Sequence, residues 1–426
     1  MINIFWFRRD LRIEDNTALI KALEEKNPVL CLFIFDTEII ENLPKDDARI
    51  SFIYQSLESL NEKLQEQDSS LLIKKGKPEK VWGELLKEFE IDKVFTNKDY
   101  EPYARRRDGA IRDILEEKGI KFERYKDQVI FEENDILKDD GKPYTVYTPY
   151  KNKWLTTFNK TDFEAQNLPS KVSFYKKVFS FPSLNELGFE ESEIKVPKFQ
   201  LDNLSSYGET RNFPSKDSTS HLGPYLRFGT VSIRNIICSL GSKESVFLSE
   251  LIWREFFMQI LYHFPKVVNN NFRAKYDGIQ WRNNEEEFKK WCTGQTGYAI
   301  VDAGMRELNT TGYMHNRVRM VVASFLCKHL LIDWKWGEAY FAEKLLDYEL
   351  SANNGNWQWA AGTGCDAAPY FRVFNPYTQQ EKFDKKIDYI KKWVPEYGTE
   401  KYVKPIVDHK VARERALETY KNGIEG

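Results

Sequence analysis

The hydrophobic pattern changes once along this chain, and that change constrains its fold more than any other feature. In residues 1–130 short apolar runs alternate with longer amphipathic stretches. The runs predict strands at 2–7, 29–35, 71–74, 93–96 and 122–124, and the stretches predict helices near 16–26, 47–66, 78–90 and 103–118. Strands separated by helices favour a Rossmann-like parallel α/β sheet with right-handed crossovers.

From about residue 201 onward the apolar residues stand mostly at helical spacing, which predicts an all-helical domain. Between 131 and 200 Asp, Lys, Pro, Ser and Tyr dominate, and 142–150 has the composition of turns and extended chain. We therefore expect three parts: an α/β domain at 1–130, a long connector at 131–200 and a helical domain at 201–426. Roughly the last 25 residues predict a solvated helix.

Several common chemistries find no support in the sequence. The first predicted strand is not followed by GxGxxG, and GxxxxGK[ST] is missing, so a dinucleotide or phosphate loop of the usual kind is not expected. The five Cys have no CxxC spacing, which argues against zinc, predicts no metal site and favours a reducing compartment. With neither a secretory leader nor a membrane-length apolar run, we expect a cytoplasmic protein.

The net charge of −2 excludes a global basic field. Any contact with nucleic acid must then come from a local cluster of cations whose charge is cancelled elsewhere in the chain.

The densest chemical pattern lies at 353–376. Trp357 and Trp359 stand among amide and small side chains, shortly after the carboxylates Asp347 and Glu349. An ordinary helical core would use Leu and Ile here. Wide aromatic faces beside amides and carboxylates suit a flat, heteroaromatic ligand.

Two helical segments place polar or charged residues beside a large apolar residue on one face. Glu250, Trp253 and Arg254 share a face at i, i+3 and i+4, which fits either a surface ion pair beside a Trp or a pocket mouth. Asn316, Arg319 and Met320 share another face. An ion pair of Arg319 with Asp347 could be purely structural or could also hold a cofactor.

Three further features have ordinary structural explanations when taken alone. The Ser/Thr-rich turn before residue 223 can cap a helix or hold a phosphate. His315 suits packing or hydrogen bonding better than catalysis. Trp281 and Trp334, each in an unremarkable context, suit a hydrophobic core.

Together these segments resemble the DNA photolyase/cryptochrome family, most closely its class I cyclobutane pyrimidine dimer photolyases. The resemblance runs in order through the whole chain. The similar segments are 5–12, 144–149, 219–223, 250–256, 312–320, 347–359 and 366–376.

The resemblance implies an N-terminal antenna domain and a helical domain that buries FAD. Asn353 would face the reactive flavin nitrogen. The matching flavin positions are Tyr207, Thr219, Ser220, His221, Leu222, Gly223, Phe247, Glu250, Arg254, Asn316, Arg319, Asp347, Tyr348, Glu349 and Asn353. Four of these depart from the common family residues: Glu349 stands for Asp, His221 and Gly223 differ within the turn, and Phe247 stands for Trp.

The resemblance also implies light-driven splitting of cyclobutane pyrimidine dimers in UV-damaged DNA by reduced FAD. Glu250 and Asn353 would be the catalytic residues. Indoles expected to carry an electron to the flavin are Trp357, Trp334 and Trp281. Positions matching the flipped lesion are Glu250, Trp253, Asn316, Met320 and Trp359, and those matching phosphate contacts are Arg211 and Arg317.

Other functions remain open at this point. A cryptochrome photoreceptor would need a lost substrate pocket or a signalling extension, and a (6-4) photolyase a pair of His where 314–318 has one. A non-enzymatic DNA binder has the near-neutral charge against it. Glu101 matches a folate-contacting carboxylate, but the antenna could equally be a flavin or a deazaflavin, or be missing. We expect a monomer with no obligate protein partner.

Overall fold

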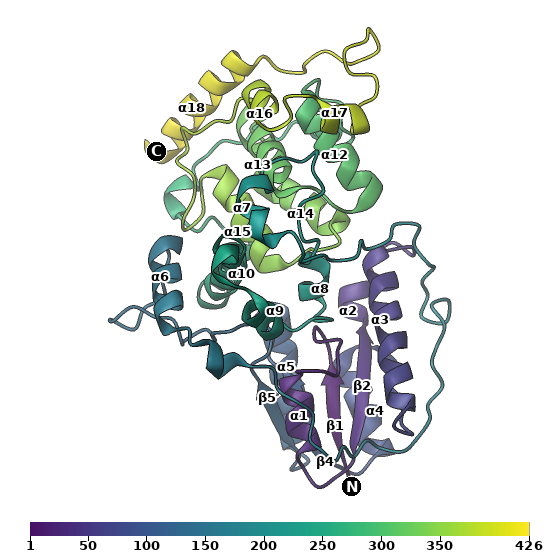
Figure 1. Cartoon of the computed structure of the whole chain (residues 1–426). Helices are drawn as coiled ribbons and strands as arrows, with labels where there is room; N and C mark the ends of the chain where they lie inside the picture. Colours follow the sequence, from purple (N-terminus) through teal and green to yellow (C-terminus); the bar gives the residue numbers. More distant parts are fainter. Residues whose placement is uncertain (426) are drawn as a thin grey trace. The chain divides into compact units, whose positions relative to one another are not determined.

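The computed structural model describes residues 1–425, which form two compact units (Figure 1). We name them the α/β unit and the helical unit. The α/β unit contains Met1–Asp135, Trp154–Lys198 and Leu222–Gly241. The helical unit contains Ile136–Lys153, Phe199–His221 and the described residues from Ser242 onward.

A five-stranded parallel sheet forms the centre of the α/β unit, in the order β3-β2-β1-β4-β5. The strands are β1 (Ile2–Phe7), β2 (Val29–Asp36), β3 (Leu72–Gly76), β4 (Ile91–Asn97) and β5 (Lys121–Tyr125). β1 and β2 are buried along their whole length, because helices cover both faces of the sheet. All five predicted strands are confirmed, within about two residues at each end.

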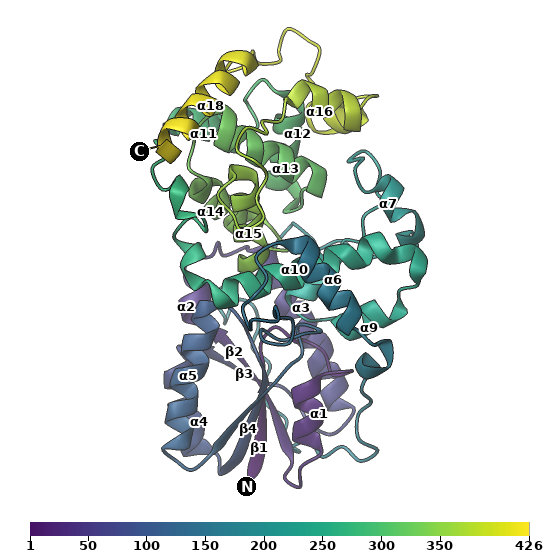
Figure 2. The same ribbon diagram turned by 90° about the vertical axis from the view of Figure 1, so that its left-hand side faces the viewer.

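Alternate residues of β1 enter two different cores. Phe5 and Phe7 pack with α1 (Thr17–Leu23) and α3 (Ala48–Gln65). Ile4 and Trp6 pack with α4 (Pro78–Glu88) and α5 (Pro102–Glu116), which lie on the opposite side of the sheet from α1 in Figure 2. The four predicted helices are confirmed, and a short α2 (Thr37–Ile40) follows β2.

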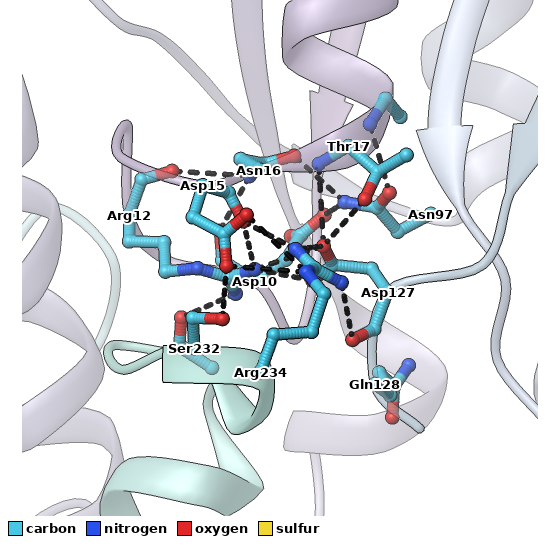
Figure 3. Close-up of polar contacts among 12 residues, drawn as sticks. Asp10, Arg12, Asp15, Asn16, Thr17, Asn97, Asp127, Gln128, Ser232 and Arg234 are labelled. Carbon is cyan, nitrogen blue, oxygen red and sulfur yellow. Dashed lines mark hydrogen bonds and ion pairs between the residues drawn. The ribbon is translucent and has the colours of Figure 1, made fainter. Parts of the chain in front are cut away.

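The segment 222–241, with α8 (Gly223–Arg227) and α9 (Ile233–Ser239), belongs to the α/β unit. Figure 3 shows the reason: buried Arg234 lies 3.1 Å from an oxygen of Asp15 and 2.8 Å from one of Asp127. Arg12 donates to both oxygens of Asp127 at 2.8 and 2.7 Å. Buried guanidinium groups require such partners, so Arg234 holds segment 222–241 in the α/β unit. The predicted boundary at 201, with every later residue in the helical domain, therefore differs from the observed division.

The predicted connector is only partly a connector. Residues 154–198 are largely irregular, but they pack with the α/β unit. The prediction of turns and extended chain at 142–150 was wrong at its end, because α6 (Tyr147–Thr157) begins there. Pro149 misled the prediction, since proline is tolerated in the first turn of a helix, where the N–H groups have no partner in the helix.

The helical unit confirms the prediction for the C-terminal half. Its helices are α7 (Tyr207–Thr210), α10 (Ser245–His263), α11 (Glu285–Cys292), α12 (Ala299–Thr311), α13 (Asn316–Ser324), α14 (Trp334–Lys344), α15 (Leu350–Ala361), α16 (Pro376–Phe383), α17 (Asp388–Trp393) and α18 (His409–Glu425). A π-helical turn, Phe325–His329, follows α13. The terminal helix α18 is amphipathic and buries Ala412, Ala416 and Tyr420.

Two absences concern residues 1–425. No helix among them is long and apolar enough to cross a membrane. Nor does that part of the chain bring three or more His, Cys, Asp or Glu side chains together in a group suited to a metal ion.

Candidate functional site

One face of α10 carries the first group of predicted site residues. Glu250, Trp253 and Arg254 are half-buried, whereas the intervening Leu251 and Ile252 are buried. The Trp253 indole stacks on the ring of Tyr147, with centroids 3.5 Å apart and planes 9° apart. Sequence reasoning missed Tyr147, because it lies in the segment that was predicted to be extended.

Glu250 and Arg211, which the resemblance gave different roles, form one ion pair with a nitrogen–oxygen distance of 2.5 Å. The Arg211 guanidinium also lies 5.5 Å from the ring centre of Tyr207. Tyr207 meets Phe247 edge-on at 5.3 Å. Burial and the Glu250 carboxylate raise the pKa of Tyr207 to about 12, so this phenol is neutral.

The predicted pair of Arg319 with Asp347 is present and bidentate. Arg319 Nη1 and Nη2 donate to the two Asp347 oxygens at 3.1 and 3.0 Å, and Nε donates to the carbonyl of Met314 at 2.7 Å. Burial alone would lower the pKa of Arg319, but Asp347 raises it overall. A guanidinium held along three directions is a fixed positive charge near the start of α13. On the same helix Asn316 is exposed and Met320 is half-buried.

A second cluster joins the turn before residue 222 to the residues that precede α13. Thr219 Oγ1 lies 3.0 Å from Tyr313 Oη, and the His221 ring is 4.9 Å from the Tyr313 ring. His221 Nε2 lies 2.7 Å from an Asp217 oxygen. Ser220 belongs to the same turn, whereas Leu222 and Gly223 belong to the α/β unit.

Within residues 1–425, three buried polar atoms of this cluster have no hydrogen-bond partner: Ser218 Oγ, His221 Nδ1 and His315 Nε2. His315 Nδ1 accepts the N–H of Arg317 at 3.1 Å and so caps α13. Burial, then Arg319 and Arg317, lower the pKa of His315 to about 4. Buried polar atoms are rarely left unpaired, so the cluster fits a polar ligand group surrounded by cations.

Asn353 on α15 is held by a residue that sequence reasoning missed. Its amide nitrogen donates to the Glu338 carbonyl at 3.0 Å and to Glu338 Oε1 at 2.9 Å. These two bonds fix the amide plane and leave its oxygen as the acceptor for a ligand. Burial raises the pKa of Glu338, which Asn353 partly offsets. Only the helical spacing of Glu338 from Trp334 could have pointed to it.

Tyr348 and Glu349, which directly precede α15, are buried to different extents. Glu349 is buried and accepts the Ser351 hydroxyl at 2.9 Å, while Tyr348 is half-buried. The longer carboxylate in place of Asp therefore already has a partner within its own helix turn.

The three indoles predicted to conduct electrons belong to one hydrophobic cluster. Trp357 and Trp334 are 2% and 1% exposed, and Trp281 is half-buried at the edge of the cluster. Trp334 Nε1 donates to Asn271 Oδ1 at 2.9 Å. The Trp357 ring lies against Gly337, where an added Cβ would meet it at 2.1 Å. Exposure therefore increases from Trp357 and Trp334 to Trp281.

Trp359 lines a mostly apolar cavity together with Phe257, Phe272 and Gln358. The guanidinium of Arg372, which sequence reasoning also missed, lies 6.0 Å from its ring centre.

The guanidinium groups of Arg211, Arg317 and Arg372 lie near one another, and the first two are the predicted phosphate contacts. Arg317 donates to Asn212 Oδ1 at 2.6 Å and lies 4.3 Å from the ring centre of Phe383. Burial, then Arg211 and Arg372, lower the pKa of Arg317. Such repulsion between guanidinium groups indicates a local cationic cluster, although the chain as a whole has a net charge of only −2.

Glu101 lies in the α/β unit, between β4 and α5. Its carboxylate accepts Arg9 Nη1 at 2.9 Å and Arg227 Nη1 at 3.0 Å. Burial would raise the pKa of nearby Asp99, but Arg9 and other guanidinium groups lower it to about 2. Arg9 follows β1, and Asp99 and Glu101 follow β4, at the point where the strand order reverses and ligands of open α/β sheets commonly bind.

The fold and site together define a class: an α/β unit with a parallel sheet, and a helical unit with clustered cations and carboxylates beside buried indoles. Residues 3–170 match the protein-family model described as DNA photolyase, and residues 247–401 match the FAD binding domain of DNA photolyase. The chain belongs to the DNA photolyase/cryptochrome family.

Individual relatives match over nearly the whole chain. A protein of Halobacterium salinarum named deoxyribodipyrimidine photo-lyase is 35% identical, with 98% of each chain covered. A bacterial class III photolyase structure from Agrobacterium tumefaciens is similar at a TM-score of 0.90 and 34% identity, with 100% of this chain and 98% of that one covered. An archaeal photolyase from Sulfolobus tokodaii with two FAD molecules is similar at 0.88 and 38%, with 99% and 100% covered.

Proposed function

We propose that the protein uses light and reduced FAD to split cyclobutane pyrimidine dimers in DNA. The observation that carries the proposal is the α10 face, where Glu250 and Trp253 stand half-buried beside Arg211. It combines an acidic group and a flat wall on one turn of α10 with a cation from the end of α7. Whole-chain similarity to proteins named deoxyribodipyrimidine photo-lyase supports the same reaction.

The residues of the helical unit fit FAD. The unpaired atoms of Ser218, His221 and His315 suit ribityl or phosphate oxygens, and Arg319 supplies positive charge close to them. The amide of Asn353, oriented by Glu338, would contact the flavin ring. Reduced FAD, when bound, supplies the light-driven electron, and the protein supplies binding and electrostatics.

The lesion would be bound outside the DNA stack, as is usual for enzymes that act on bases. Trp253 and Trp359 offer flat walls, and stacking contributes about 1–3 kcal/mol per base. Glu250 would donate to, or stabilise charge on, the pyrimidine carbonyls. Because Glu250 is paired with Arg211, we propose that a DNA phosphate takes over Arg211 and frees Glu250 for the lesion.

The geometry disfavours a (6-4) photolyase. Repair of a (6-4) lesion is expected to need acid catalysis by a pair of His. The matching segment of this chain contains only His315. Its Nδ1 already accepts the Arg317 N–H, and its pKa of about 4 makes it neutral near pH 7. A neutral, capping imidazole is a poor general acid.

The decisive test is illumination of the chemically reduced holoenzyme with each lesion in turn. Repair of cyclobutane dimer DNA is expected. Glu250→Gln should lower repair yield more than binding, and Trp253→Ala should lower binding. Repair of (6-4) DNA alone, or of neither lesion, contradicts the proposal.

We also propose an antenna chromophore near Glu101, at the edge formed by the ends of β1 and β4. The guanidinium groups of Arg9 and Arg227 supply cations there, and the Sulfolobus tokodaii relative carries a second FAD. That relative favours a flavin here, with folate and deazaflavin as the other outcomes. An absorption spectrum and mass spectrometry of chromophores released from protein purified in the dark decide among them.

Finer assignments are also proposals. The motifs favour class I, although the Agrobacterium tumefaciens structure is a class III photolyase. We further propose a cytoplasmic monomer without an obligate protein partner. Light scattering of the holoenzyme tests the monomer, since a dimer would double the measured mass.

A further inference from the structure

The ring contacts of Trp357 do not follow the predicted path to Trp334 and Trp281. Its indole meets the indole of Trp291 at a centroid distance of 6.1 Å and an angle of 70°. Trp291 in turn meets the ring of Tyr340 at 5.7 Å and 65°. Among residues 1–425, Trp334 makes no ring-to-ring contact in this range with Trp357 or Trp281.

We infer that Trp291 and Tyr340 form a second electron-transfer branch that delivers electrons to Trp357. The inference rests on the proposed function, because it needs a bound flavin for which Trp357 is the first donor. It adds a branch that ends at the half-buried Tyr340 on α14, separate from the predicted path through Trp334 to Trp281.

The surroundings of Trp291 suit a relay. The indole is fully buried, and its Nε1 donates to the carbonyl of Val322 at 3.1 Å. A peptide carbonyl stabilises positive charge on an indole but is too weak a base to take its proton. An oxidised Trp291 therefore keeps its proton and passes the positive charge on.

Tyr340 suits the end of the branch. Its hydroxyl donates to Asn309 Oδ1 at 2.6 Å, and the side chain is half-buried. Burial raises the pKa of this phenol, so it is protonated in the resting protein. Once oxidised, it can release the proton to water near Asn309 and remain as a neutral radical.

The steps balance in electrons and protons. Trp357 gives one electron to the light-excited, oxidised flavin and is left as a radical cation. One electron then moves from Trp291 to Trp357, and one from Tyr340 to Trp291, while the Tyr340 hydroxyl proton leaves to water. A soluble thiol returns a hydrogen atom to the tyrosyl radical.

The test uses the full-length holoprotein with oxidised FAD, blue light and a thiol. Trp334→Phe interrupts the predicted path, and we expect a residual rate of flavin reduction through Trp291. Adding Trp291→Phe should remove this residual rate. Phe288→Leu in the Trp334→Phe background is the matched control, because Phe288 stacks on Trp291 at 5.7 Å but is too hard to oxidise to act as a donor.

Tyr340→Phe keeps the ring and removes only the hydroxyl, so it tests the branch even if Trp291→Phe fails to fold. In the Trp334→Phe background, light should produce a tyrosyl radical signal by electron paramagnetic resonance, and Tyr340→Phe should abolish it. A double variant as active as Trp334→Phe, or a tyrosyl signal that survives Tyr340→Phe, overturns the inference. Unchanged reduction in Trp357→Phe would instead refute the proposed first donor.

Discussion

Gly337→Ala tests how closely Trp357 packs against α14. A Cβ at position 337 would lie 2.1 and 2.4 Å from two ring atoms of Trp357, and 2.6 Å from Cδ2 of Leu326. Carbon atoms prefer about 3.5–4.0 Å, so the ring must move by roughly 1 Å or more. Trp357 is 2% exposed and has little room to do so.

The expected cost follows from two opposing effects. Overpacking a buried site costs about 1–3 kcal/mol, and replacing Gly by Ala inside a helix returns about 1 kcal/mol. We expect the free energy of unfolding to fall by up to about 2 kcal/mol. Light-driven flavin reduction should slow as well, because the displaced ring is the proposed first donor.

Gly109→Ala on α5 is the matched control. It makes the same change inside a helix, but beyond the helix's own nearby backbone no atom of residues 1–425 lies within 4 Å of the added Cβ. It should stabilise the protein by up to about 1 kcal/mol and leave light-driven reduction unchanged. Denaturant unfolding of both variants, together with their rates of flavin reduction, provides the measurement. If Gly337→Ala behaves like Gly109→Ala, the packing argument is refuted.

Three further outcomes are expected. Trp357→Phe should abolish light-driven reduction while FAD stays bound, and chemically reduced enzyme should still repair; retained photoreduction would contradict this. Arg211→Ala should lower the slope of log affinity for lesion DNA against log salt by about one phosphate contact, whereas Lys63→Ala on α3 should leave it unchanged. Because the pKa of His315 is lowered from 6.5 to about 4, the stability present above pH 6.5 should fall as pH drops toward 4. His315→Asn, which can still cap α13, should lessen that fall by up to about 3 kcal/mol, and an unchanged pH profile would count against the pKa shift.

The sequence predicted the sheet well because parallel strands buried on both faces must be continuously apolar. Ile2–Phe7 and Val29–Asp36 meet this condition, and the helices between them show helical spacing. The chain could not reveal that 222–241 returns to the α/β unit. That placement depends on Arg234 reaching Asp15 and Asp127, which are far away in sequence and belong to no local pattern.

The same contrast between local patterns and long-range contacts separates the site residues that were predicted from those that were missed. Arg319 and Asp347 were paired from residue types that the resemblance placed together. Glu338, Tyr147 and Arg372 were missed, because each acts through contacts with a residue from another element. Such contacts have no spacing rule, so only the folded arrangement reveals them.

The charge distribution reconciles a near-neutral chain with a polyanionic substrate. The net charge is −2, yet Arg211, Arg317 and Arg372 lie close enough together to lower the pKa of Arg317. Burial lowers the pKa of His315, and Arg319, Arg317 and Arg211 lower it further. Fields of this kind act within about one Debye length, roughly 8–10 Å. A nearly neutral protein can therefore hold phosphates and an anionic flavin at a local cluster of cations.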